Sequence, residues 1–301
     1  ITGEGAMYNW KYKSNAPWYS YCSNIKAVEI GDSVTSIGNY AFCNCTSLAN
    51  VEIPDSVTKI GGYAFENMSS ITSAVIGSGV THIGGGTYTN YGCFYMCRKL
   101  EKITFTGTLP TLDGSPFSGA DYVKMVYVPK AEFTAYWNKF GSLLPGNARL
   151  LTIEMEEEFL IEDGVLLAYQ GLGGNIVIPD GVTTIGKYAF QGCYAMNSIQ
   201  IADGVTSIGE YAFVNCNQLT GLTFGGNAVK MDEGAFAYCE SLETVGNSAA
   251  MEDIGAYAYA YTAITDIDLT GAVNIGDQAF LKEELTPFQV KLSDKIVTLG
   301  D

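Results

Sequence analysis

Apolar residues recur at a fixed spacing along most of this chain. The segment 34–45 reads VTSIGNYAFCNC, and close copies of it begin at Val57, Val182 and Val205. Phe42 and Phe65 are 23 residues apart. The same spacing separates three later phenylalanines, Phe190, Phe213 and Phe236. Because a fixed period of roughly 20 to 50 residues is the signature of a repeat array, the repeated text predicts architecture first.

A single copy predicts two short strands and a turn. The segment 48–53 ends in alternating apolar and polar residues, which is typical of a half-buried strand. Pro54 lacks a backbone donor and ends that strand. The segment 57–60 forms a second extended piece, Gly61 is expected to let the backbone turn, and Phe65 is expected to fill the core from a tight turn. One copy buries too little apolar surface to offset its ordering entropy, so the copies must stack into a β-solenoid.

Several copies depart from the period. Between Ile83 and Phe94 the chain carries six extra residues, which we assign to an insertion at 84–91 (GGGTYTNY). The copy at 103–123 keeps its apolar positions but lacks the Ile-Gly pair and the cysteine. After Phe236 the period shortens to 21 residues, and the end of the chain is expected to open one more copy.

The stretch 126–174 breaks the repeat and predicts a boundary near residue 150. One apolar helix face is formed at i, i+3, i+4 and i+7 by Phe133, Tyr136, Trp137 and Phe140. We expect this helix, near 130–140, to cap a first array at 1–150. The segment 159–170 predicts a β-hairpin around Glu162, Asp163 and Gly164 that starts a second array at 151–301. The predicted fold is a β-rich, right-handed, curved solenoid of short strands and turns.

These residues carry a resemblance to a known family. The pattern I-P-x-S-V-T-x-I-G-x-x-A-F-x-x-C resembles the 23-residue leucine-rich repeats of the BspA-like family, roughly over 25–123 and 176–301. The stretches 3–10, 17–21 and 159–179 are also similar to such proteins. The resemblance implies a curved solenoid on secreted or cell-surface proteins, commonly of anaerobic bacteria and some protists. Adhesion to host or neighbouring cells is the function it implies.

Charge is distributed unequally between the halves. Residues 1–150 hold 11 Lys and Arg against 10 Asp and Glu, whereas residues 151–301 hold 5 against 22. With a net charge of −16 we expect neither nucleic acid nor an anionic membrane as partner, because nothing neutralises phosphates. Solubility explains the acidic half, and a cation or a basic partner is the alternative.

Localisation is expected from the resemblance alone. No apolar run is long enough to insert into a membrane. The chain starts at Ile1 without a charged and then apolar leader, so we expect that any signal peptide is missing from this sequence. The prediction is a secreted or cell-surface protein.

Five of the eight cysteines share one repeat position, namely Cys45, Cys97, Cys193, Cys216 and Cys239. Met68 and Ala120 replace them in other copies, so we interpret the position as apolar and expect reduced thiols. Disulfides between stacked copies are the alternative, because neighbouring strands are only ~4.8 Å apart. The spacing matches no zinc signature. Cys22 and Cys43 lie outside this position, and we expect them to be the more exposed thiols.

No group of residues predicts catalysis. His82 is the one histidine, and its repeat position is polar and variable, so we expect it to face solvent. The glycines of 171–174 precede no predicted helix, which argues against a phosphate loop. Asp266 and Asp268 lack the EF-hand pattern for calcium, and the acidic run at 154–158 fits a solvated linker. We predict no catalytic residue, no cofactor and no metal site.

The predicted concave face varies from copy to copy while the core positions repeat. Its outward positions in the first array are Glu29, Glu52, Val75, Thr104 and Tyr127. Those in the second array are Val177, Gln200, Thr223, Gly246 and Asp268. Solenoids bind along such faces, so we take the first set, together with Tyr88 and Tyr91 of the insertion, as candidate partner-binding residues. The alternative is that these positions vary freely.

Two classes of function fit these observations. The first is a non-enzymatic adhesion or binding module for a protein or glycan of a host or a neighbouring cell. The second is a structural spacer that displays other domains away from the cell wall. Tyrosines also stack in register, Tyr40 with Tyr63 and Tyr188 with Tyr211; such ladders can hold sugars, although packing over a turn is their commoner use.

Overall fold

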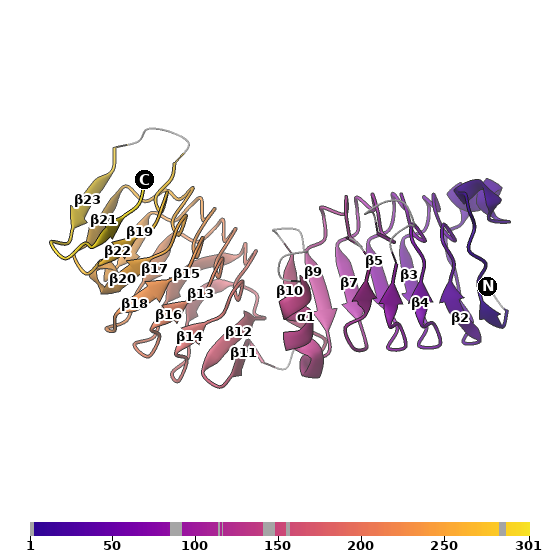
Figure 1. Cartoon of the computed structure of the whole chain (residues 1–301), viewed down its shortest axis with the longest axis horizontal. Helices are drawn as coiled ribbons and strands as arrows, with labels where there is room; N and C mark the ends of the chain where they lie inside the picture. The colour runs from indigo at the N-terminus through magenta and orange to yellow at the C-terminus, as the bar shows by residue number, and fades with distance from the viewer. Residues whose placement is uncertain are drawn as a thin grey trace. The chain divides into compact units, whose positions relative to one another are not determined.

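The structure, a computed structural model, confirms the β-solenoid (Figure 1). It describes residues 3–84, 92–113, 115, 117–140, 148–154, 157–282 and 287–301. The chain divides into two compact units, residues 1–154 and 155–301. In each unit, one coil contributes a strand to a first sheet, then a corner turn, then a strand to a second sheet.

In unit 1 both sheets are parallel. The first sheet runs in the order β1 (Gly5–Ala6), β2 (Val34–Ile37), β4 (Lys59–Ile60), β6 (His82–Ile83) and β8 (Thr111–Leu112). The second sheet runs in the order β10 (Arg149–Thr152), β9 (Met125–Val128), β7 (Lys102–Phe105), β5 (Ser73–Ile76) and β3 (Asn50–Ile53). The 3₁₀ helices η1 (Lys13–Asn15) and η2 (Tyr19–Asn24) precede β2, and η3 (Lys130–Glu132) leads into α1 (Phe133–Phe140).

Unit 2 repeats this arrangement after an antiparallel hairpin. Its first sheet consists of β11 (Phe159–Glu162), β12 (Val165–Tyr169), β14 (Thr184–Ile185), β16 (Ser207–Ile208), β18 (Val229–Met231), β20 (Met251–Ile254), β22 (Asn274–Ile275) and β24 (Thr298–Leu299). Its second sheet consists of β13 (Gly174–Val177), β15 (Met196–Gln200), β17 (Gly221–Thr223) and β19 (Thr244–Gly246). After η4 (Ser248–Ala250), a separate pair is formed by β21 (Asp266–Leu269) and β23 (Gln289–Leu292).

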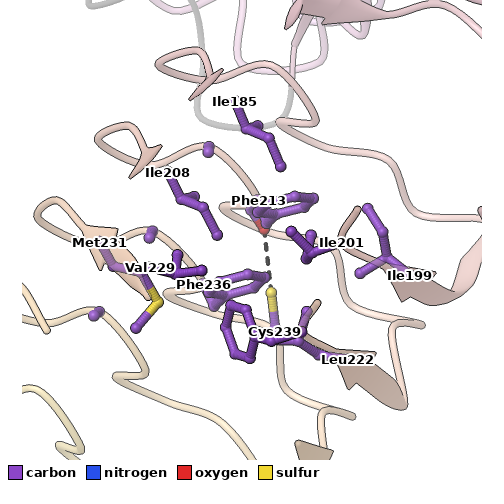
Figure 2. Close-up of a cluster of buried hydrophobic side chains, with 14 of the residues drawn as sticks. Ile185, Ile199, Ile201, Ile208, Phe213, Leu222, Val229, Met231, Phe236 and Cys239 are labelled. Atoms are coloured by element: carbon purple, nitrogen blue, oxygen red, sulfur yellow. Dashed lines mark hydrogen bonds between the residues drawn. The ribbon is translucent and has the colours of Figure 1, made fainter. Parts of the chain in front are cut away.

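Phenylalanines stack through the core at the spacing that the sequence repeats. In unit 2 the ring centroids of Phe190 and Phe213 lie 4.7 Å apart and those of Phe213 and Phe236 lie 4.5 Å apart. All three side chains are fully buried. Figure 2 shows Phe213 between Ile208 of the first sheet and Ile201, and Phe236 beside Val229 of the first sheet. Each coil thus completes the apolar surroundings of the next coil, as expected for a fold that a single copy cannot hold.

The cysteines at the shared repeat position have apolar surroundings, and three of their thiols also donate hydrogen bonds. All eight cysteines are buried and none forms a disulfide. Cys239 Sγ donates to the backbone oxygen of Phe213 at 3.1 Å (Figure 2), and Cys216 and Cys97 make the same bond to Phe190 and Phe65. The thiol therefore satisfies a carbonyl of the preceding corner turn, which Met68 and Ala120 cannot do.

The expectation that Cys22 and Cys43 are exposed is wrong. Their side chains are 3% and 1% exposed. Cys22 lies 23 residues before Cys45, so it continues the cysteine position into η2, which acts as one more corner turn. Cys43 is buried as well, and its thiol donates to Glu66 Oε2 at 3.1 Å.

The glycine of the Ile-Gly pair serves close approach between coils rather than a turn. A Cβ on Gly61 would lie 2.4 Å from Asn39 Oδ1 and 2.6 Å from the Asn39 backbone nitrogen. The left-handed residues of the corner turn are instead Tyr40 and Asn44, with φ of 58° and 64°. The corresponding tyrosine of the next copy, Tyr63, has φ of 57°.

The predicted helix and hairpin are both present. Helix α1 buries Phe133, Tyr136 and Phe140 against the unit 1 core, and the Phe140 ring lies 5.6 Å from that of Phe105. Strands β11 and β12 pair antiparallel across Asp163 and Gly164. Both residues have positive φ, 49° and 78°, as a two-residue hairpin turn of type I′ requires.

Candidate binding surfaces

The outward positions of unit 1 form one continuous row on its second sheet. Glu52 pairs with Val75, Val75 with Thr104, and Thr104 with Tyr127. Glu52 is exposed and the other three side chains are half-buried. We call these four residues the outward row. Side chains two positions apart on a strand share a face, so this face also carries Asn50, Ser73, Lys102 and Met125.

The face has a cationic and aromatic end. Lys102 Nζ lies 4.6 Å from the ring centroid of Tyr127, a cation–π contact. The Tyr127 hydroxyl lies 3.3 Å from Met125 Sδ. At the start of the same strands, Lys124 Nζ lies 2.9 Å from Glu101 Oε1. Glu52 lies at the opposite end of the row, so the face offers an acid, an aliphatic group, a hydroxyl and an aromatic ring in sequence.

Glu29 does not pair with this row. Glu29 is exposed and lies in a segment that forms no strand. The second sheet ends at β3, which is the strand after this segment. The prediction that Glu29 continues the sheet is therefore wrong. Tyr88 and Tyr91 lie outside the described residues.

In unit 2 the row runs from Val177 through Gln200 and Thr223 to Gly246. Val177 is 59% exposed. Contrary to the prediction, Asp268 does not pair with this row: β19 and β21 belong to different sheets, and the Asp268 backbone nitrogen donates to Ser248 Oγ of η4 at 3.2 Å.

Asp268 instead bonds within its own strand pair. It accepts hydrogen bonds from the backbone and hydroxyl of Thr270 at 2.9 and 2.6 Å, and from Lys291 Nζ at 3.0 Å. These bonds, those from Thr270 first, lower the pKa of Asp268 to about 2.

The ionisable groups considered above as catalytic candidates are instead partly or fully buried in the fold. His82 is half-buried rather than fully solvent-facing, and its Nε2 lies 3.0 Å from Asp113 Oδ2. Burial raises the pKa of the Cys97 thiol to about 12, which suppresses the nucleophilic thiolate. Among the residues that the structure describes, no group of three or more His, Cys, Asp or Glu could hold a metal ion.

The structure contains a tyrosine-lined cavity that was not predicted from the sequence. It has a volume of about 600 Å³ and is lined by Tyr12, Lys13, Ser14, Tyr19, Tyr40, Tyr63, Glu66 and Tyr95. A second cavity of about 540 Å³ shares Tyr95 and is otherwise lined by Met96, Arg98, Ser118, Gly119, Asp121 and Tyr122. The sequence feature that could have indicated this cavity is the high aromatic content of residues 8–21, which lie outside the regular repeats.

Comparison with known families places the chain in one of them. Residues 15–140 and 170–286 match the BspA type leucine rich repeat region in six copies. Because these ranges cover most of the sequence, the chain belongs to the BspA-type leucine-rich repeat family. A comparison with curated proteins gave no match.

Solved structures of bacterial leucine-rich repeat proteins are similar to this chain. One from Bacteroides ovatus shares 25% identity with a TM-score of 0.40, covering 89% of this chain and 79% of its own. One from Eubacterium ventriosum shares 20% with a TM-score of 0.42, covering 95% and 90%. A leucine rich cell surface protein from Faecalibacterium prausnitzii shares 20% with a TM-score of 0.35, covering 84% and 76%. Within the described part of this chain, no helix has the length and apolarity to cross a membrane.

Proposed function

We propose that this protein is a non-enzymatic binding module, secreted or displayed on a cell surface, that adheres to a protein or glycan of a host or a neighbouring cell. The observation that carries the proposal is the outward row of unit 1, where four paired strands present four chemically different side chains. Family membership supports a repeat protein that binds at a surface.

The outward row has the features of a recognition surface. Its inward neighbours repeat as Val51, Ala74, Ile103 and Val126, all buried, whereas the outward side chains change at each step. Tyr127 is held by Lys102, so it loses little side-chain entropy when a partner covers it. Aromatic residues of this kind supply much of the energy at interfaces.

The test begins with the intact chain on a glycan array and an extracellular-matrix protein array. For a bound component, Tyr127→Ala is expected to weaken affinity by about 1–3 kcal/mol while the melting temperature stays nearly unchanged. Thr223→Ala, on the corresponding row of unit 2, is the matched control and is expected to bind normally. Absence of binding on both arrays would support the structural spacer instead.

The insertion remains a separate prediction. If Tyr88 and Tyr91 belong to the same patch as the outward row, replacing both with Ala will weaken the binding free energy for the partner found on the arrays by on the order of 1–3 kcal/mol. Unchanged affinity would leave recognition to the outward row alone.

A further inference from the structure

The corner turns of unit 1 carry a column of tyrosines. The rings of Tyr40 and Tyr63 stack in parallel, with centroids 5.0 Å apart and planes within 2°. Tyr95 continues the column edge-on, 6.3 Å from Tyr63. These residues lie in the corner turns, and none of them belongs to the outward row of the second sheet.

The segment before the repeats forms the opposite wall. Residues 12–19 contribute Tyr12, Lys13, Ser14 and Tyr19 to the cavity over the column. This wall is held in place by Trp18, whose Nε1 donates to the Ala41 backbone oxygen at 2.6 Å. The Trp18 ring also stacks on Phe42 at 5.9 Å. The cavity is therefore built from two parts of the chain that are fixed to each other.

Tyr95 is in the lining of both cavities. Together they form what we call the tyrosine trough. The tyrosines along it are Tyr12, Tyr19, Tyr40, Tyr63, Tyr95 and Tyr122. Each cavity alone has the size of a small-molecule site, roughly 300–1,000 Å³, so the trough suits an extended ligand with repeated units.

The charges of the trough balance in each cavity. The first holds Lys13 and Glu66, and the second holds Arg98 and Asp121. A phosphate or sulfate group would meet a carboxylate in either cavity, and a quaternary ammonium group would meet a basic side chain. An acyl chain would displace water from Lys13, Arg98 and Asp121 without offering them hydrogen bonds in return, which is costly.

A neutral sugar chain satisfies both features of the lining. The C–H faces of pyranose rings pack against aromatic faces, and sugar hydroxyls both donate to carboxylates and accept from ammonium and guanidinium groups. We propose that the tyrosine trough binds a neutral oligosaccharide lying across the corner turns of unit 1. This site is separate from the outward row, so either proposal can fail while the other stands.

Unit 2 provides the matched comparison. Tyr188 and Tyr211 occupy the same repeat position as Tyr40 and Tyr63 and stack at 5.7 Å, and they have the same left-handed backbone. A tyrosine column thus belongs to the scaffold of both units. What sets unit 1 apart is the wall of residues 12–19, which turns its column into one side of a cavity.

In the test, the intact chain is titrated with cellohexaose, xylohexaose, mannohexaose or maltohexaose, and the affinity is measured by isothermal titration calorimetry. A sulfated heparin hexasaccharide and a chitosan hexamer serve as the anionic and cationic comparisons. We expect at least one neutral hexasaccharide to bind and both charged ones to bind at least tenfold more weakly. Tyr12→Ala and Tyr40→Asn are each expected to weaken that binding at least tenfold. Asparagine is used because this chain places it at other left-handed positions, such as Asn44.

Tyr188→Asn is the control and is expected to change the affinity less than twofold. Tyr12 is 58% exposed, so its replacement tests the trough even if Tyr40→Asn unfolds the chain. Binding of none of the neutral hexasaccharides, tighter binding of a charged one, or unchanged affinity in Tyr12→Ala would each overturn the proposal.

Discussion

At the residue scale, one aromatic position does most to join neighbouring coils. Phe213 is fully buried between Phe190 and Phe236, so its ring contributes to two coil interfaces at once. Offset ring pairs add about 0.5–1.5 kcal/mol beyond their buried area. Its loss would leave a cavity that the stacked backbone cannot close.

We predict that Phe213→Ala lowers the free energy of unfolding by about 3–5 kcal/mol. Denaturant titration followed by circular dichroism measures this change. Val177→Ala is the control, because that side chain is 59% exposed. A loss below 1 kcal/mol for Phe213→Ala would show that the coils tolerate a missing ring.

The buried thiols predict a pH dependence of stability. Burial raises the pKa of Cys97 from 9.0 to about 12, and it also raises that of Cys93. In the unfolded chain these thiols ionise first as pH rises, so their contribution is complete below about pH 9 and is lost between pH 9 and 12. Cys97 alone accounts for on the order of 4 kcal/mol across that window.

The measurement is the unfolding free energy at pH 7.5, 8.5, 9.5 and 10.5. We expect little change between the first two values and a steady decline above them. Cys97→Ala should decline less steeply, since it removes one of the shifted groups. Equal slopes for the two proteins would contradict the assignment of this effect to Cys97.

At the element scale, α1 covers the end of the unit 1 core in place of another coil. Its buried side chains contact the last phenylalanines of the array, Phe105 and Phe117. The Tyr136 hydroxyl reaches the backbone oxygens of Gly107 and Thr108, 3.1 and 3.0 Å away. These carbonyls lie between β7 and β8, and β8 is the last strand of the first sheet.

We predict that Tyr136→Phe destabilises the protein by about 0.5–1.5 kcal/mol, because the carbonyl oxygens of Gly107 and Thr108 lose a hydrogen-bond donor. Tyr21→Phe is the matched control at a side chain that is 67% exposed. Thermal unfolding of the two variants distinguishes them. Equal melting temperatures would mean that water replaces the Tyr136 hydroxyl at no cost.

At the scale of the whole molecule, the contacts divide at residues 154 and 155. The unit 2 core is built from residues of that unit alone, from Leu166 to Ala279. Unit 1 closes with α1 and β10, and unit 2 opens with its own hairpin. Each unit therefore has what an independently folding domain needs, a core and a covered end.

We predict that fragments 1–154 and 155–301 each fold alone. Each should show a strand-rich circular dichroism spectrum and a cooperative thermal transition. The acidic second fragment is expected to be the more soluble one, since residues 151–301 hold 22 Asp and Glu against 5 Lys and Arg. If either fragment is unfolded or aggregates on its own, its folding depends on contacts with the other unit.

The sequence by itself determined the repeat, and with it most of the fold. A 23-residue period specifies which side chains stack, so the phenylalanine column, the register of Glu52 with Val75, and the apolar cysteine position could all be predicted. The helix and the hairpin followed from local patterns, an i, i+3, i+4, i+7 face and an Asp-Gly turn. Each of these features depends on neighbours one period or one turn away.

Tertiary structure decided what the period does not describe. Cys22 is buried because η2 folds as an extra corner turn, although the sequence there lacks the repeat motif. Asp268 does not pair with the row of Gly246, and its backbone nitrogen instead bonds to Ser248 of η4. The tyrosine trough exists because Trp18 fixes residues 12–19 against a column that begins at Tyr40. Such contacts join segments with no common spacing, and only the folded chain brings them together.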